Sequence, residues 1–437
     1  MKLQYAVLLI LATHLTALPA LAQAALPAPD KVRMDRLQLM QGFPPAAPKQ
    51  VTRGSYLTQY PQARWAFQHM RELLPSRNVP RGSGTPSMLP PGEDLRAAID
   101  ALRFRGPEGE QSFAQYLDST YADGTLMLLD GQLIYEAYAP GMQAQQPHML
   151  WSLSKSVVGL LAGQLLHEGV LKGDAPVTDY LPELAASGWQ GATVQQVLDM
   201  TAAIDYRETF DGPQSDLFRY ALAAGMLPLP PGYQGPTSLY EYLPGIGAQG
   251  RHGAEFHYRT AHTEVLGWLL RRATGQSTAE LIAERLWSRL GTEQDAYMLV
   301  DAHGAEWAGA GFNASLRDLA RFGEMLRLDG AYNGRQIIAA EVLANIRAGG
   351  DREAFKAGGR TWQPGYSYRN QFWISHNADG AYEALGAHGQ MVHINPALGL
   401  VVVRLSSHPQ ASSGFTFDTT RPALEALADW LRGRKSS

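Results

Sequence analysis

The stretch MLWSLSKSVVGLLAGQLLHEG, residues 149–169, constrains the fold more than any other part of this chain. Apolar residues lie on most sides of the helix that this stretch predicts, among them Val157, Val158, Leu161 and Leu165. A helix that is apolar nearly all round is a buried core helix. Lys155 falls inside the same run, and a buried lysine is costly unless it is paired or used. The stretch therefore predicts a core helix that carries a functional lysine near its start.

Ser152 and Lys155 lie three residues apart and are expected to project from one face of the first helical turn. The unpaired N–H groups at a helix start favour negative charge on or near the serine oxygen. A partly desolvated lysine loses its proton more easily than one in water, so it can take the proton of the hydroxyl. Because Ser-x-x-Lys is common by chance, this interpretation depends on the apolar setting of the lysine. The neighbouring Ser154 and Ser156 are expected to form local hydrogen bonds.

Composition excludes several other kinds of site. The chain has no cysteine, which rules out disulfides, thiol catalysis and cysteine-ligated metals. Its net charge of −4 gives no basic excess, so nucleic-acid binding is not expected. His252, His257 and His262 recur every five residues, a period that fits neither a helix nor a strand, and there is no HExxH pair. We therefore expect no metal and no cofactor.

The N-terminal residues are typical of an export signal. Lys2 precedes an apolar run, and small residues follow at Ala20 and Ala22, which predicts a signal peptide over residues 1–22 with cleavage after Ala22 or Ala24. The alternative is an uncleaved anchor, but His14 interrupts the apolar run, and spanning a bilayer takes about 20 apolar residues. We expect an exported, periplasmic protein with no membrane span in its mature chain. Residues 23–110, rich in Pro, Gly and Arg, are expected to form an extension laid over the main domain.

Residues 111–437 are expected to form that domain, with an α+β fold. GTLMLLDGQLIYEAYA predicts two strands joined at Asp130-Gly131, and GQMVHINPALGLVVVRLSS predicts two more near the other end of the chain. Between them lies a mostly helical lobe over about residues 170–330, with a capping box at Thr193 and Gln196 and a helix end at Gly275. An antiparallel sheet flanked by helices, with this lobe beside it, would place a site in the cleft between them.

Three segments together resemble the serine β-lactamase and penicillin-binding fold, in its class C-like branch. SLSK resembles the first motif, FHYRTAHTEVLGWLL the tyrosine motif, and LGAHGQMVHINP the third motif. Within the fold the chain is most similar to the 6-aminohexanoate-dimer hydrolases and the family VIII esterases. The likeness continues through RWAFQHMRELLPS, VLDMTAAIDY and LRDLARFG, and so covers nearly the whole mature chain.

The resemblance implies roles for particular residues. Ser152 is the implied nucleophile, with Lys155 and Tyr258 sharing its proton network, and sequence leaves open which of the two is the base. The amides of Ser152 and Ala387 are implied to form the oxyanion hole. The substrate-binding candidates are Tyr206, Trp373, Thr260 and His388. Tyr206 and Trp373 are equally open to a packing position, and His388 to a rim position.

Two departures from the family pattern bear on the substrate. EALG precedes Ala387 where many lactamases have Lys-Thr-Gly, so the cation that attracts a substrate carboxylate is missing and Glu383 would repel an anion. Thr260 replaces the asparagine of Tyr-x-Asn. We therefore expect an exported serine hydrolase that cleaves small, uncharged amides or esters through an acyl-enzyme on Ser152. The alternatives are a β-lactamase or D,D-peptidase, and a catalytically silent cell-envelope binding protein of the same fold.

Overall fold

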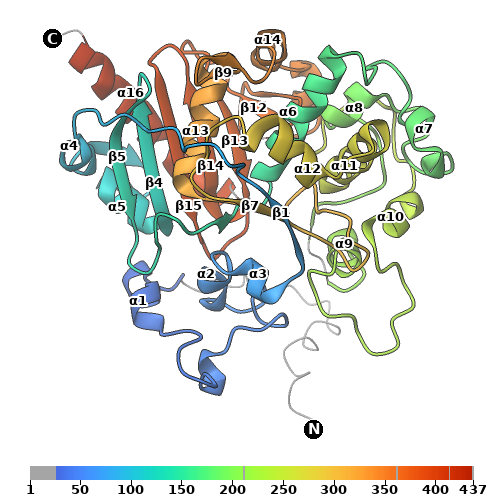
Figure 1. Ribbon diagram of the computed structural model, residues 1–437, viewed down its shortest axis with the longest axis horizontal. Helices are drawn as coiled ribbons and strands as arrows, with labels where there is room; N and C mark the ends of the chain where they lie inside the picture. The colour runs from blue at the N-terminus through green and yellow to red at the C-terminus, as the bar shows by residue number, and fades with distance from the viewer. Residues whose placement is uncertain (1–25, 210–211, 361–362, 413, 436–437) are drawn as a thin grey trace, which may run out of the picture.

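A computed structural model describes residues 26–209, 212–360, 363–412 and 414–435 (Figure 1). The expected signal peptide, residues 1–22, lies outside the described residues. Strands from both ends of the domain form one central sheet, and most of the helices between them gather on one side of it. This arrangement is the α+β fold that the sequence predicts.

The central sheet has seven antiparallel strands in the order β11-β12-β13-β14-β15-β4-β5. The strands are β4 (Ala122–Leu129), β5 (Gln132–Tyr138), β11 (Ser367–Arg369), β12 (Phe372–Ile374), β13 (Tyr382–Gly386), β14 (Gln390–Asn395) and β15 (Leu400–Ser406). Asp130 and Gly131, with φ of 49° and 78°, form the tight turn between β4 and β5 that the sequence predicts. Because β15 pairs with β4, the two ends of the domain share one sheet.

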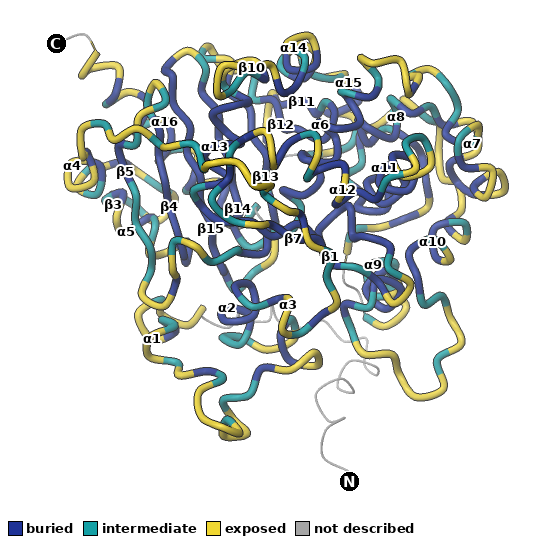
Figure 2. The backbone as a smooth tube through the Cα atoms, viewed as in Figure 1, coloured by how far each residue is buried: buried dark blue, intermediate teal, exposed yellow. Residues whose placement is uncertain are grey.

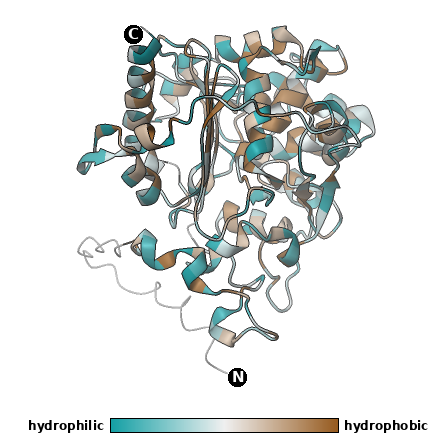
Figure 3. Cartoon of the chain, turned by 60° about the vertical axis from the view of Figure 1, so that its left-hand side comes forward, coloured by the Kyte–Doolittle hydropathy of each residue, from teal (hydrophilic) through white to brown (hydrophobic). Residues whose placement is uncertain are grey.

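Helices cover both faces of this sheet, as Figure 3 shows with the sheet nearly edge-on. On one face α13 (Leu316–Arg327) and α6 (Leu153–His167) pack against Val392, Val401 and Val403 in the largest core cluster. On the other face the C-terminal helix α16 (Gly414–Lys435) packs against residues that alternate with these. This alternation is the period of two of a strand buried on both faces.

A second group of elements lies beside the sheet. A four-stranded sheet, in the order β1-β7-β8-β6, is formed by β1 (Ser76–Val79), β7 (Ala296–Leu299), β8 (Phe312–Ala314) and β6 (His148–Met149). The helices of the lobe are α7 (Val177–Tyr180), α8 (Val194–Leu198), α9 (Asp216–Ala223), α10 (Leu239–Tyr242), α11 (Thr260–Thr274) and α12 (Thr278–Ile282). The capping box at Thr193 and the C-cap at Gly275 both form as expected. Two further helices, α14 (Ala340–Ala348) and α15 (Arg352–Ala357), follow α13.

Residues 26–110 are exposed over about half of their length, and their longest buried stretch lies around residues 63–70 (Figure 2). They contain α1 (Met34–Leu37), α2 (Gln62–Ala66), α3 (Met70–Leu73), α4 (Arg96–Asp100) and β2 (Arg103–Gly106), which pairs with β3 (Gly109–Ser112). β1 pairs with β7, and the side chains of Tyr56, Phe67 and Met70 are fully buried in the main core cluster. This segment therefore supplies part of the core.

Candidate active site

Ser152 and Lys155 meet at the start of α6. Ser152 is the N-cap residue, and residues 153–163 are all buried. Lys155 is only 1% exposed. Its Nζ donates to Ser152 Oγ at 2.9 Å and to the carbonyl of Gly309 at 2.7 Å. The buried lysine is thus held directly against the serine hydroxyl.

The two other serines of the stretch have structural partners. Ser154 Oγ accepts a hydrogen bond from the Phe312 amide at 3.0 Å. Ser156 Oγ donates to the carbonyl of Gln371 at 2.7 Å. Both serines thus form hydrogen bonds with residues distant in sequence rather than locally, and Ser152 is the one that meets Lys155.

Tyr258 lies directly before α11 and faces the lysine. Lys155 Nζ is 5.2 Å from the centre of the Tyr258 ring. Trp373, on β12, stacks on the same ring with centroids 5.4 Å apart and an angle of 23° between the planes. The structure therefore brings together Ser152 and Lys155 with Tyr258 and Trp373, which lie in two segments more than 100 residues from them and from each other.

Arg360 is a cation beside this cluster that the sequence analysis did not identify. Its guanidinium carbon lies 5.1 Å from the centre of the Tyr258 ring and 4.8 Å from that of Trp373. Burial lowers its pKa from the usual arginine value. The third motif lacks a cation, as expected, but the loop after α15 places one against the two aromatic rings.

The end of β13 approaches the start of α6 closely. A Cβ on Gly386 would lie 2.2 Å from the carbonyl oxygen of Leu150, so only glycine fits there. This contact places the turn at Ala387 beside the residues that precede Ser152. Within the described part of the chain, the amides of Ser152 and Ala387 donate to no acceptor. Two free N–H groups thus lie on neighbouring segments.

The residues flanking these amides are held by a ring cluster. Trp151 and His388 both have left-handed backbones, with φ of 50° and 62°. Their rings lie 5.3 Å apart, and Phe67 of the N-terminal segment contacts them at 5.4 Å and 4.8 Å. His388 Nδ1 lies 2.7 Å from the carbonyl of His408, and burial lowers the pKa of His388 to about 4. His388 is half-buried and helps to hold the turn at Ala387, and its contact with substrate stays a prediction.

Tyr206 and Thr260 lie deeper than a substrate-lining position suggests. Tyr206 is 1% exposed, and its hydroxyl has no hydrogen-bond partner among the described residues. The Thr260 hydroxyl donates to the carboxylate of Glu208, which also accepts from the Thr260 amide at 2.8 Å. Both the hydroxyl and the amide of Thr260 are thus already hydrogen-bonded to the carboxylate of Glu208.

Glu264 is a second buried charge that the sequence analysis did not single out. It lies on α11 and is 2% exposed. It accepts hydrogen bonds from the amides of Ala308 and Gly309, both at 2.9 Å, and from the Tyr220 hydroxyl at 2.7 Å. Burial raises its pKa from 4.5 to about 7, and the charge of Lys155 opposes this shift. Glu264 is therefore linked to Lys155 through Gly309.

This shift predicts a pH-dependent stability. Because the folded protein holds the Glu264 proton up to about pH 7 and an unfolded chain releases it near 4.5, stability falls as pH rises across that interval. Because one pKa unit corresponds to about 1.36 kcal/mol, the free energy of unfolding should fall by on the order of 3 kcal/mol. A Glu264→Gln variant should lack this decline when urea unfolding is measured from pH 5 to pH 8. The same change at exposed Glu341 should preserve the decline, and a Glu264→Gln profile parallel to that of wild type would contradict the prediction.

The described residues contain neither a group of three metal-ligating side chains nor a helix long and apolar enough to cross a membrane. The three histidines spaced by five have separate partners. His252 accepts from the Ala203 amide, His257 contacts Glu255, and Trp189 donates to His262.

Comparisons with known proteins agree with this arrangement. Residues 110–427 match the Beta-lactamase family. The chain is 35% identical over 394 residues to 6-aminohexanoate-dimer hydrolase of Paenarthrobacter ureafaciens, covering 88% of this chain and 97% of that protein. A solved structure from Bacillus anthracis, provisionally described as a 6-aminohexanoate-dimer hydrolase, has a TM-score of 0.80 and 30% identity, covering 89% and 99% of the two chains.

A family VIII carboxylesterase shares the fold, with a TM-score of 0.52 at 17% identity over 74% of this chain and 98% of that one. The resemblance that the sequence motifs indicated is thus confirmed. The chain belongs to the β-lactamase family and is a serine hydrolase of that family.

Proposed function

We propose that this hydrolase cleaves small linear amides or esters through an acyl-enzyme on Ser152, with amides of ω-amino acids as its substrates. The observation that carries the proposal is the 2.9 Å contact between Lys155 Nζ and Ser152 Oγ at the start of a buried helix. The relative at 35% identity is named as a hydrolase of 6-aminohexanoate dimer, which supports this choice of substrate.

In the proposed reaction, Ser152 Oγ attacks the substrate carbonyl while its proton passes to the neutral amine of Lys155. We assign the base to Lys155 because it is the group in hydrogen-bond contact with the hydroxyl. The amides of Ser152 and Ala387 stabilise the oxyanion, since neither donates elsewhere within the described residues. Tyr258, next to Lys155, gives its phenolic proton to the leaving amine or alcohol and regains a proton from the Lys155 ammonium. Water then attacks the acyl-enzyme and releases the acid.

The test is a substrate panel on the wild type and on Ser152→Ala. The panel contains a p-nitrophenyl ester, 6-aminohexanoate dimer and nitrocefin. We expect turnover of the ester and the dimer by the wild type and none by Ser152→Ala. Faster turnover of nitrocefin than of the other two would favour a β-lactamase. Equal activity in Ser152→Ala would overturn the proposal, and no activity on any substrate would favour a silent binding protein.

Arg360 provides a second prediction about the substrate. Its guanidinium lies over Tyr258 and Trp373, where it would attract a substrate carboxylate. A hydrogen bond to a charged group contributes roughly 1.5–3 kcal/mol. Loss of this contact in Arg360→Gln should therefore raise the KM for 6-aminohexanoate dimer about 10-fold to 100-fold. The KM for a neutral p-nitrophenyl ester should change less than threefold. Arg352→Gln, on the exposed side of α15, is the matched control. An equal rise in KM for both substrates would contradict this role.

We also propose that the chain is exported and that its mature form begins after residue 22. The support is the pattern of Lys2, an apolar run and Ala20 and Ala22. N-terminal sequencing of the protein from the periplasmic fraction of expressing cells tests this proposal. Recovery of intact Met1 in the cytoplasmic fraction alone would contradict it.

A further inference from the structure

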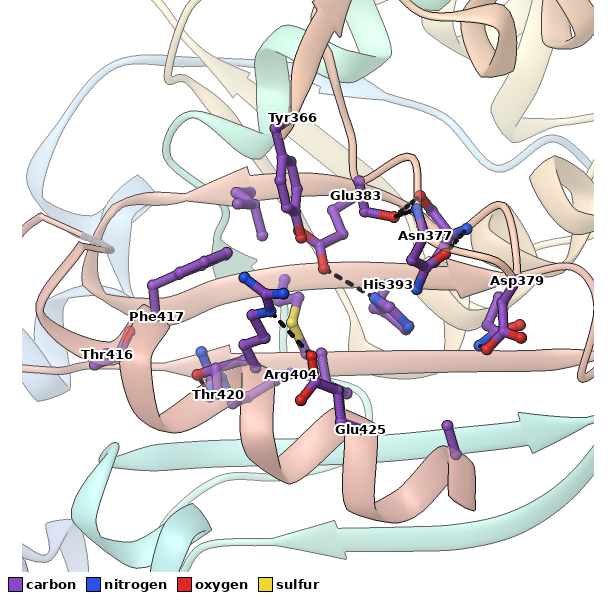
Figure 4. Close-up of a pocket in the computed structure, with 18 of the residues that line it drawn as sticks. Tyr366, Asn377, Asp379, Glu383, His393, Arg404, Thr416, Phe417, Thr420 and Glu425 are labelled. Atoms are coloured by element: carbon purple, nitrogen blue, oxygen red, sulfur yellow. Dashed lines mark hydrogen bonds and ion pairs between the residues drawn. The ribbon is translucent and has the colours of Figure 1, made fainter. Parts of the chain in front are cut away.

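A cavity of about 350 Å³ lies between α16 and the sheet, on the face opposite α6 (Figure 4). Its floor is formed by β13, β14 and β15, and α16 forms its roof. Three of its lining residues, Tyr366, Leu385 and Phe417, also pack in the aromatic cluster that contains Tyr258 and Trp373. The cavity therefore shares part of its wall with the cluster that contains Tyr258 and Trp373, and its volume is in the range of small-molecule sites.

Glu383 projects into this cavity from β13, as Figure 4 shows. The residue is 4% exposed. Its Oε1 lies 2.9 Å from His393 Nδ1, on the neighbouring strand. Its Oε2 has no hydrogen-bond partner among the described residues. Burial raises the pKa of the nearby Tyr366 hydroxyl, and the charge of Glu383 and a side-chain contact with it act in the same direction. Glu383 thus presents Oε2 to the cavity beside the Tyr366 hydroxyl, without a hydrogen bond of standard geometry among the described residues.

Arg404 projects into the same cavity from β15 and is 3% exposed. Its Nε donates to the carbonyl of Gly389 at 2.9 Å, and its Nη1 donates to the hydroxyls of Tyr116 and Thr420. All three partners are neutral. No carboxylate of the described residues forms an ion pair with Arg404, and its Nη2 has no acceptor there. Arg404 is therefore a buried cation without a counter-ion.

The two charges face one cavity but do not pair with each other. In the sheet, Glu383 is opposite His393, and Arg404 is opposite Met391, two residues earlier on β14. From strand spacings, their Cα atoms are about 12 Å apart. Other charges around the cavity are already paired, since Arg421 binds Glu425, and Arg432 binds Asp379 and Asp429. Glu383 has His393 as its one charged partner, when that imidazole is protonated, and Arg404 has no ion-pair partner within the described chain.

Apolar side chains lie between the two charges. Leu385 and Met391 come from the floor, and Phe417 and Leu424 come from the roof. A buried carboxylate oxygen without a hydrogen bond and a buried cation without a counter-ion are costly unless a ligand or water satisfies them. A ligand that satisfies both has a positive end, a negative end and an apolar part between them.

We propose that this cavity binds a zwitterionic aliphatic amino acid, with its ammonium group on Glu383 and its carboxylate on Arg404. Such a molecule satisfies both free groups at once and covers the apolar floor with its methylenes. The site contains neither Ser152 nor Lys155, so it is a ligand site beside the catalytic residues and extends beyond the proposed reaction. A free ω-amino acid is the kind of product that the proposed amide hydrolysis would release next to it.

Calorimetric titration of 4-aminobutanoate and 6-aminohexanoate into Ser152→Ala protein tests the site without any reaction. We expect at least one of the two to bind, and hexylamine and hexanoate to bind at least tenfold more weakly because each satisfies one charge. This comparison of ligands needs no substitution in the cavity. If neither amino acid binds, or if the single-charge analogues bind as well, the proposal is wrong.

Variants then locate the ligand. Glu383→Gln, added to Ser152→Ala, should weaken binding at least tenfold, whereas Glu425→Gln should leave the Kd within twofold because Glu425 is exposed and already paired with Arg421. Trp373→Leu should also preserve binding. A loss of binding in Trp373→Leu with normal binding in Glu383→Gln would place the amino acid in the catalytic cleft and overturn the proposal. Since these readouts do not depend on turnover, failure of the proposed function would not affect them.

Discussion

A Lys155→Met variant will hydrolyse a p-nitrophenyl ester with a kcat about 10³-fold to 10⁴-fold below wild type, the upper part of the range for general acid–base catalysis. Methionine fills a similar volume but cannot take a proton from Ser152 Oγ, which lies 2.9 Å from Lys155 Nζ. It also leaves the buried carbonyl of Gly309 without its donor. Stopped-flow and steady-state kinetics will show whether formation of the acyl-enzyme is the slowed step.

The matched control is Lys172→Met, which removes the same charge from an exposed position. Its kcat should remain within twofold of wild type. If Lys155→Met stays within tenfold of wild type while Ser152→Ala is inactive, Lys155 is not the base, and Tyr258 becomes the candidate. A thermal unfolding curve for each variant separates this outcome from loss of the fold.

The parts of the structure that sequence predicted are those encoded by local rules. The strands around Asp130-Gly131 follow from a turn that needs two positive φ angles, and both residues have them. The helix that begins after Ser152 follows from its apolar pattern, and the Thr193 capping box follows from a three-residue spacing. In each case the signal and the structure lie within one short segment.

The parts of the site that sequence missed depend on tertiary packing. Arg360 reaches Tyr258 and Trp373 from a loop that has no motif of its own, so its role had no sequence signal. Glu264 did have one. It is a charged residue between Thr263 and Val265 on a buried helix, the same kind of signal that identified Lys155. Reading every charge within an apolar helix in this way would have found it.

The N-terminal segment shows a second limit. Its richness in proline and glycine suggests an arm laid over a domain, and composition does not reveal which of its side chains are buried. In the structure Phe67 packs against the rings of Trp151 and His388, which flank the two free amides. The geometry of the candidate oxyanion hole therefore depends on contacts across more than 300 residues of chain, and no local pattern encodes such contacts.

Gly386→Ala is the second substitution with a large expected effect. The backbone of Gly386 has a φ of −131°, which alanine adopts without strain, so the glycine is needed for space. The new Cβ would lie 2.2 Å from the carbonyl oxygen of Leu150, and backbone atoms must move to relieve the overlap. Because Ala387 is the next residue, its amide should move away from Ser152, and kcat should fall about 10²-fold to 10³-fold, the cost of removing one oxyanion donor.

Gly433→Ala is the matched control, because a Cβ there has no neighbour within 4 Å and the residue lies in α16. It should leave kcat unchanged and stabilise the protein by roughly 0.5–1 kcal/mol, the helix preference of alanine over glycine. Ester kinetics and thermal unfolding of both variants test this pair. A folded Gly386→Ala protein with kcat within threefold of wild type would show that Ala387 is not an oxyanion donor, and the third motif would then act in this chain only as packing against α6.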